Sequence, residues 1–215
     1  MKKIFLIITM GIFAFNTTKA QPQVDLKAKA ILDGVSAKTK TYTSMSIDFS
    51  YSIENKTQKI KDSQQGTLII KGDKYCLEIA KQKVFSDGKT VWTYLKDSKE
   101  IQINNPSNDD EAINPQSIFT LWEKGFRYKL IKEEMQNNVM VQIVDLVPIK
   151  GKSYFKVRII IDKLKKQVLK AIVYDKNGNI YTYKVNKFNS NINTNDATFT
   201  FNKANYPGVE VIDLR

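Results

Sequence analysis

The sequence of 215 residues contains no histidine and only one cysteine, Cys76. Without histidine there is no histidine-based triad, no histidine metal site and no side chain whose unperturbed pKa lies near neutrality. A single cysteine forms neither an internal disulfide nor a thiolate zinc site. The densest carboxylate cluster, Asp109, Asp110 and Glu111, lies in a polar stretch with the composition of a loop. We therefore expect no metal, no cofactor and no catalysis.

Arginine and glycine are also scarce. The nine glycines are scattered singly, so neither a phosphate-binding loop nor a dinucleotide-binding fingerprint is present. Only Arg127, Arg158 and Arg215 are arginines among the 34 basic residues. Nucleic-acid and phosphate sites favour arginine for its bidentate geometry. The lysine surplus therefore indicates a solvated surface, which is also compatible with attraction to anionic membranes, and we expect no nucleic-acid partner.

Beyond the N-terminus the chain has no long apolar run. Lys2 and Lys3, the apolar residues 4–15 and a small residue at Ala20 together have the pattern of a secretory signal. About a dozen apolar residues are too few for a membrane span, which needs roughly 20. We expect cleavage after Ala20, so that residues 1–20 are removed and residues 21–215 form one exported domain. Because Gln21 follows the cut, the mature chain offers no N-terminal cysteine for lipid attachment.

Periodicity divides the chain into a helix and a long run of strands. Apolar residues recur at helical spacing over residues 24–35, which predicts an amphipathic helix. Over residues 44–54 apolar and polar side chains alternate, which predicts a strand with one apolar face. Pro115 and Gly125 suit the start and end of a short helix over residues 115–124. Further strands are predicted over residues 67–71, 74–80, 90–95, 100–103, 128–133, 139–147, 154–162, 167–174, 179–187 and 198–202.

About eleven strands joined by short turns favour an antiparallel sheet, and twist makes so wide a sheet curl. We expect a mainly β (α+β) fold: an open, strongly curved antiparallel half-barrel with helices covering an apolar cavity. The concave side of such a sheet is filled by side chains, plugged by helices or occupied by a ligand. Two short helices are scant cover, which favours a cavity, and a fully packed core is the alternative.

The run SDGKTVW, from Ser86 to Trp92, joins a polar turn to an alternating aromatic strand. Such a turn either holds a phosphate or connects two strands. Asp87 and Gly88 are what a tight turn requires, because glycine adopts positive φ and aspartate bonds the neighbouring backbone.

This run, the segment GTLIIKGDKY over residues 66–75 and the endings ATFTF (197–201) and PGVEVIDLR (207–215) resemble the periplasmic outer-membrane lipoprotein carrier family, LolA. The likeness spans nearly the whole mature chain, and its sharpest motif is the SDGKTVW run. The resemblance implies an open barrel whose apolar cavity shields the acyl chains of a lipoprotein as it crosses the periplasm. It also implies that the Ser86–Lys89 segment is a turn between strands.

The resemblance implies partners as well: acylated lipoproteins as cargo, an inner-membrane ABC-type transporter that releases them, and an outer-membrane acceptor. The protein itself is expected to be a monomer. Alternation then assigns candidate cavity residues on the strands, and the second helix supplies candidates for a lid. The cavity candidates are Met45, Ile47, Phe49, Tyr51, Leu68, Ile70, Tyr75, Leu77, Ile79 and Trp92, and the lid candidates are Ile118, Leu121 and Trp122.

One departure from the family concerns lid control. Family members have an Arg-Pro pair after the strand that matches residues 68–71, and the arginine helps to hold the lid shut. Gly72 and Asp73 stand at that place here, so this latch is not carried over to the chain. A lipid-sensing or lipid-binding signalling domain with the same half-barrel is the alternative function.

Overall fold

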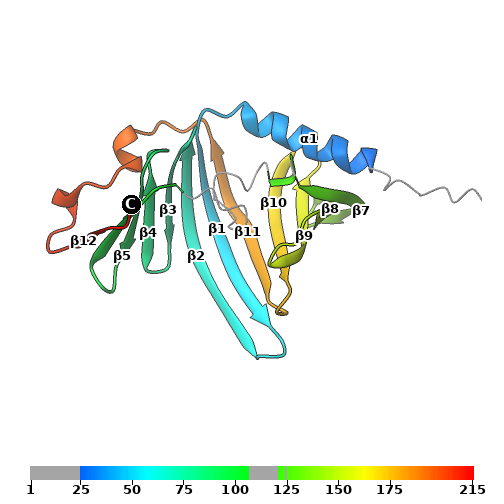
Figure 1. Cartoon of the computed structure of the whole chain (residues 1–215). Coiled ribbons are helices and arrows are strands. Elements are labelled where there is room, and N and C mark those ends of the chain that lie inside the picture. The colour runs from blue at the N-terminus through cyan, green and yellow to red at the C-terminus, as the bar shows by residue number, and fades with distance from the viewer. Residues whose placement is uncertain (1–24, 107–120, 124) are drawn as a thin grey trace, which may run out of the picture.

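The computed structural model describes residues 25–106, 121–123 and 125–215 (Figure 1). Within them lie one α-helix, α1 (Leu26–Lys40), and three short 3-10 helices, η2 (Leu121–Glu123), η3 (Asp196–Phe199) and η4 (Lys203–Asn205). The strands are β1 (Met45–Asn55), β2 (Ile60–Lys71), β3 (Lys74–Ile79), β4 (Gln82–Ser86), β5 (Val91–Leu95), β6 (Glu100–Asn104), β7 (Phe126–Gln136), β8 (Val139–Pro148), β9 (Tyr154–Asp162), β10 (Gln167–Asp175), β11 (Ile180–Ser190) and β12 (Glu210–Asp213).

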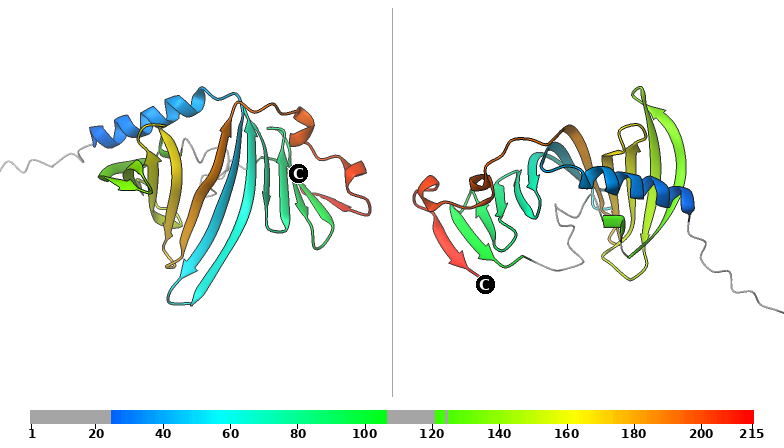
Figure 2. Two further views of the ribbon diagram at one scale, coloured as in Figure 1. Left: turned by 180° about the vertical axis from the view of Figure 1, so that it is seen from behind. Right: turned by 90° about the horizontal axis from the view of Figure 1, so that it is seen from above.

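All twelve strands belong to one sheet, in the order β12-β6-β5-β4-β3-β2-β1-β11-β10-β9-β8-β7. Every neighbouring pair is antiparallel except β12 and β6, which are parallel. The sheet curves strongly without closing, and α1 lies on its concave side (Figure 2). The expected mainly β, open and curved architecture is therefore confirmed.

Several predicted boundaries are wrong. The sheet has twelve strands, because residues 82–86 and 210–213 were not predicted as strands. Residues 198–202 form no strand; η3 lies there instead, since Asn195 accepts a hydrogen bond from the amide of Ala197 and starts a helical turn. Helix α1 extends to Lys40, beyond the predicted end at residue 35.

Helix α1 is fastened to β7 at its first turn. One carboxylate oxygen of Asp25 accepts a hydrogen bond from the amide of Ala28 at 3.0 Å, which caps the helix. The other accepts from the amide of Leu130 in β7 at 2.9 Å. Both bonds favour the ionised carboxylate and lower the pKa of Asp25. Leu32 and Val35 are buried against the sheet, so α1 closes over its β7–β10 end.

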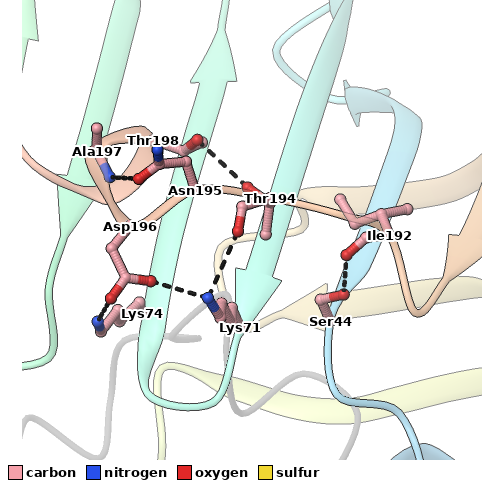
Figure 3. A network of polar contacts seen from close by, with 9 residues as sticks. All are labelled: Ser44, Lys71, Lys74, Ile192, Thr194, Asn195, Asp196, Ala197 and Thr198. Carbon is pink, nitrogen blue, oxygen red and sulfur yellow. Dashed lines mark hydrogen bonds and ion pairs between the residues drawn. The ribbon is translucent and has the colours of Figure 1, made fainter.

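The chain after β11 crosses the convex face of β2–β4 (Figure 3). Lys71 and Lys74 bind the two carboxylate oxygens of Asp196 at 2.9 and 2.7 Å, and they hold its pKa at about 2. Phe199 is fully buried beside Cys76 and Phe85, as expected for a cysteine that serves as a small apolar residue. The segment thereby covers this face and places β12 beside β6.

Candidate functional site

The concave face of the sheet carries the candidate site. Pairing across β1, β2 and β3 aligns Met45 with Ile70 and Tyr75, and Ile47 with Leu68 and Leu77. Side chains at paired positions point to the same face of a sheet. All of these residues contribute to the main apolar cluster, which also contains Leu32 and Val35 of α1. The alternation over residues 44–54 therefore identifies a real apolar face.

Burial decreases along this face. Met45 and Ile47, at the end of β1 near α1, are buried, whereas Phe49, Tyr51 and Ile53 farther along β1 are only half-buried. The same is true of their neighbours on the adjacent strands. We call this half-buried apolar surface the open wall; it consists of Phe49, Tyr51, Ile53, Leu77, Ile79, Val84, Tyr181, Tyr183 and Val185.

A glycine shapes the middle of the open wall. Gly66 is paired with both Phe49 and Ile79. A Cβ atom at Gly66 would lie 2.5 Å from Cζ of Phe49 and 2.9 Å from the backbone oxygen of Glu78. The Phe49 ring therefore lies over the backbone of Gly66. The missing side chain at Gly66 leaves the space that the ring occupies against the sheet.

Three tyrosines form the far end of the open wall. The ring of Tyr51 lies 5.2 Å from that of Tyr183 and 6.3 Å from that of Tyr181. Burial, together with the two neighbouring tyrosines, raises the pKa of Tyr183 to about 12. Burial likewise raises the pKa of Tyr51. Tyr51 and Tyr183 therefore remain uncharged at neutral pH, and the three rings present broad aromatic surface with polar tips.

Nine of the ten cavity candidates lie on this one face, four of them in the open wall: Phe49, Tyr51, Leu77 and Ile79. Trp92 does not lie with them. The pairing of β4 with β5 places it opposite Phe85, and it packs with Cys76 on the convex face. Its assignment to the cavity is corrected by this register: residues 91, 93 and 95 of β5 point to the concave side.

Other residues of the open wall were not identified from the sequence. Ile53, Val84, Tyr181, Tyr183 and Val185 complete it. Alternation within β11 was visible, but its face relative to β1 depends on a bulge between Asp48 and Phe49 that shifts the register. Val84 belongs to β4, which was not predicted.

The lid candidates are described in part. Trp122 is 3% exposed and packs on α1, where its indole N–H donates to Ser36 Oγ at 2.9 Å and to the carbonyl oxygen of Leu32 at 3.2 Å. Leu121 is half-buried against the same apolar cluster. Ile118, most of the predicted helix over residues 115–124 and the acidic cluster at residues 109–111 lie outside the described residues.

Two turns highlighted by the sequence prove to be structural. Ser86–Lys89 leads from β4 into β5, and Asp87 accepts hydrogen bonds from the amides of Lys89 and Thr90, both at 2.8 Å. The Gly72 turn joins β2 to β3, and the lysines on either side of it bind Asp196. The turn that stands in place of the family's Arg-Pro pair is therefore tied to the C-terminal segment in this chain.

A cavity of about 260 Å³ lies on the opposite, convex face. It is lined by Cys76, Phe85 and Tyr206 together with polar residues of the C-terminal segment, and the open wall has no part in it. In the described part of the chain, no group of three or more His, Cys, Asp or Glu side chains is placed to hold a metal ion. No helix among the described residues is both long and apolar enough to cross a bilayer.

Two solved structures with TM-scores of 0.50 or more support the fold, and a third is similar at a lower score. A conserved uncharacterized protein of Thermus thermophilus superposes with a TM-score of 0.59 at 14% identity, covering 87% of this chain and 99% of that one. LprF of Mycobacterium bovis has a TM-score of 0.50 at 10% identity, covering 80% and 96%. A LolA superfamily protein of Nitrosomonas europaea has a TM-score of 0.44 at 13% identity, covering 81% and 97%.

No curated protein sequence matches the chain significantly. The sequence model of one family does match it, over residues 19–171, and that family is described as outer membrane lipoprotein carrier protein LolA. The match covers more than two thirds of the 215 residues. The chain therefore belongs to the LolA family.

Proposed function

We propose that the protein is a non-catalytic periplasmic carrier, which shields lipoprotein acyl chains against the open wall and moves them from the inner to the outer membrane. One observation carries the proposal: a contiguous set of apolar side chains on the concave face is left half-buried by the described fold. Such a surface is unfavourable in water unless a ligand covers it. Membership of the LolA family supports acyl chains as that ligand.

The energetics support the need for a carrier. Each buried methylene is worth about 0.8 kcal/mol, so an acylated lipoprotein does not leave a membrane unaided. The open wall offers apolar contact without buried charge, and its aromatic and aliphatic groups impose no fixed direction on a chain. Such contacts allow release to a site that binds better.

In this proposal α1 and the segment that contains Ile118, Leu121 and Trp122 cover the cavity. The signal over residues 1–20 directs export and is cleaved after Ala20, and residues 21–215 act as one monomeric domain. Cargo comes from an inner-membrane ABC-type transporter and passes to an outer-membrane acceptor. The contact of Trp122 with Ser36 supports a link between the two covering segments.

The test is uptake of acyl chains by the mature chain. Native mass spectrometry of protein purified from the periplasm without detergent should reveal a bound lipoprotein or diacyl lipid, and the chain should bind a fluorescent fatty-acyl probe. Leu77→Asp should abolish probe binding, while Lys89→Ala, in the turn before β5, should leave it unchanged. Equal losses from both changes, or no uptake by the unaltered chain, would contradict the proposal. Bound lipid without any lipoprotein in cells would favour the lipid-sensing alternative.

A further inference from the structure

The end of the sheet farthest from α1 is formed by five hairpin turns. The strand pairings place residues 56–59, 80–81, 96–99, 149–153 and 176–179 at this end. The turns at the opposite end comprise residues 72–73, 87–90, 137–138 and 163–166. The two sets of turns differ in charge: the first set contains eight lysines and one aspartate, and the second contains four lysines and two aspartates.

Three of the five turns are joined into one surface. The amide nitrogen of the Asn55 side chain donates to the carbonyl oxygen of Asn177 and to Asn179 Oδ1, at 3.2 and 2.8 Å. The backbone amide of Lys176 donates to the carbonyl oxygen of Ser153 at 3.0 Å. These bonds connect the β1–β2, β10–β11 and β8–β9 turns, whose residues 56–59, 149–153 and 176–179 we call the basic rim.

The basic rim contains five lysines and no acidic residue. Lys56, Lys59, Lys150 and Lys176 are exposed, and within the described part of the chain none of the four has a side-chain ion pair or hydrogen bond. Among the residues that flank the rim, Lys61 adds one positive charge, and Glu54, Asp62 and Asp175 add three negative charges. The net charge of the rim and its flanks is therefore still positive. Lysines without protein partners are available to anionic groups outside the molecule.

Large apolar side chains lie among these lysines. Ile149, within the rim, is 59% exposed, and Phe155, two residues beyond it, is 52% exposed. Ile60, directly after the β1–β2 turn, is 40% exposed. Lysine interspersed with exposed isoleucine and phenylalanine is the composition of surfaces that lie at a bilayer interface, where the charges meet headgroups and the apolar groups enter the acyl boundary.

We propose that the basic rim docks on an anionic phospholipid bilayer. Charge complementarity selects this occupant, because a membrane containing anionic lipid attracts each nearby lysine and also accepts Ile149 and Phe155. The end of the open wall at Ile53 and Tyr181 lies next to the turns that form the rim. A docked rim would therefore bring this end of the open wall to the bilayer surface. Docking itself does not depend on the proposed function and is measurable without cargo.

The experiment is co-sedimentation of the mature, cargo-free chain with vesicles of phosphatidylcholine, with and without about one third phosphatidylglycerol. We expect binding only to the anionic vesicles, weakening as salt shortens the screening length. The rim variant Lys56→Glu/Lys59→Glu/Lys176→Glu should bind at least tenfold more weakly, since each lysine near a charged surface is worth about fivefold in partitioning. Ile149→Ser/Phe155→Ser should weaken the binding that remains at high salt.

A matched control carries the same change in net charge at the other end. It is Lys89→Glu/Lys165→Glu/Lys166→Glu, and each set contains one lysine with positive φ, Lys59 or Lys166. Lys165 and Lys166 follow Leu164, which is 89% exposed, so the control also tests whether the β9–β10 turn docks on the bilayer instead. Retained binding by the control supports the rim. Equal loss in both variants, loss in the control alone, or no binding by the unaltered chain would overturn the proposal. Far-ultraviolet circular dichroism establishes that all variants are folded.

Discussion

Strands β7–β10 and the far part of strands β1–β4 both present apolar side chains to the concave side, but among the described residues a helix closes over β7–β10 alone. Leu146, Val157 and Ile159 are almost fully buried beneath α1 and its neighbours. Phe49, Leu77 and Val84 belong to the same apolar cluster and remain half-buried. The same alternating pattern therefore produces a packed core in one region and an accessible apolar surface in the other.

The difference has a physical origin in what packs on each region. Helix α1 contacts β7 and β10, and Asp25 fastens its first turn to Leu130 of β7. The far ends of β1 and β2 extend well beyond the helix (Figure 1). Stability is expected to come mainly from the packed region, whereas in the proposed function the open wall is the part that binds a ligand.

The largest expected effect compares two leucines, one in each region. Leu146→Ala should lower the free energy of unfolding by about 3 kcal/mol, because it leaves a cavity in a fully buried site. Leu77→Ala should lower it by about 1 kcal/mol, because solvent already reaches that side chain. Urea denaturation measures both. Similar losses would show that the open wall is as much a part of the core as β8.

A smaller effect is expected from filling the space at Gly66. Gly66→Ala should destabilise the fold by about 2 kcal/mol, because the new methyl group meets the Phe49 ring and the backbone oxygen of Glu78. In the Phe49→Leu background the same change should cost less, since the ring is gone. A double-mutant cycle from thermal or urea unfolding gives the coupling between the two positions. Strict additivity would mean that the ring does not lie over the glycine.

The sequence predicted the face of a side chain correctly where the alternation within one strand is enough to assign it. Alternation over residues 44–54 is local, so it placed Met45, Ile47, Phe49 and Tyr51 on one face correctly. Trp92 was assigned to the wrong face because β4, which links the faces of β3 and β5, was not predicted. With that strand missing, nothing in the sequence specifies which residues of β5 point inward.

The other wrong predictions concern pairing and packing between segments that lie far apart in the sequence. After Ile60, the first half of β2 is polar on both faces and has the composition of a loop, yet it pairs along its length with β1. Strand β12 pairs in parallel with β6, more than a hundred residues earlier, and no local pattern predicts such a partner. Phe199 alternates like a strand residue, but its burial against Cys76 and Phe85 accompanies a helical turn.

Substitutions of Trp122 measure how much its contact with α1 contributes to stability. Trp122→Phe keeps most of the buried ring and removes the indole donor to Ser36 and Leu32. The loss should be about 1 kcal/mol in unfolding free energy, the usual value for one buried hydrogen bond. Trp122→Ala should also weaken retention of an acyl probe, measured by its dissociation rate. Unchanged retention would remove this residue from the cover of the open wall.

The smallest effect concerns Asp196, which joins the C-terminal segment to the β2–β3 turn on the convex face (Figure 3). The lysines lower its pKa from 3.8 to about 2, so its contribution to stability is fully present above pH 4 and is lost as the pH falls through 2. Asp196→Asn should therefore differ slightly from the unaltered chain at neutral pH and converge with it at the acidic end of a series of urea titrations. Because this carboxylate is exposed, salt should reduce the difference as well. A difference that persists unchanged at pH 2 would mean that packing of the segment around Phe199, and not the ion pairs, holds it on the convex face.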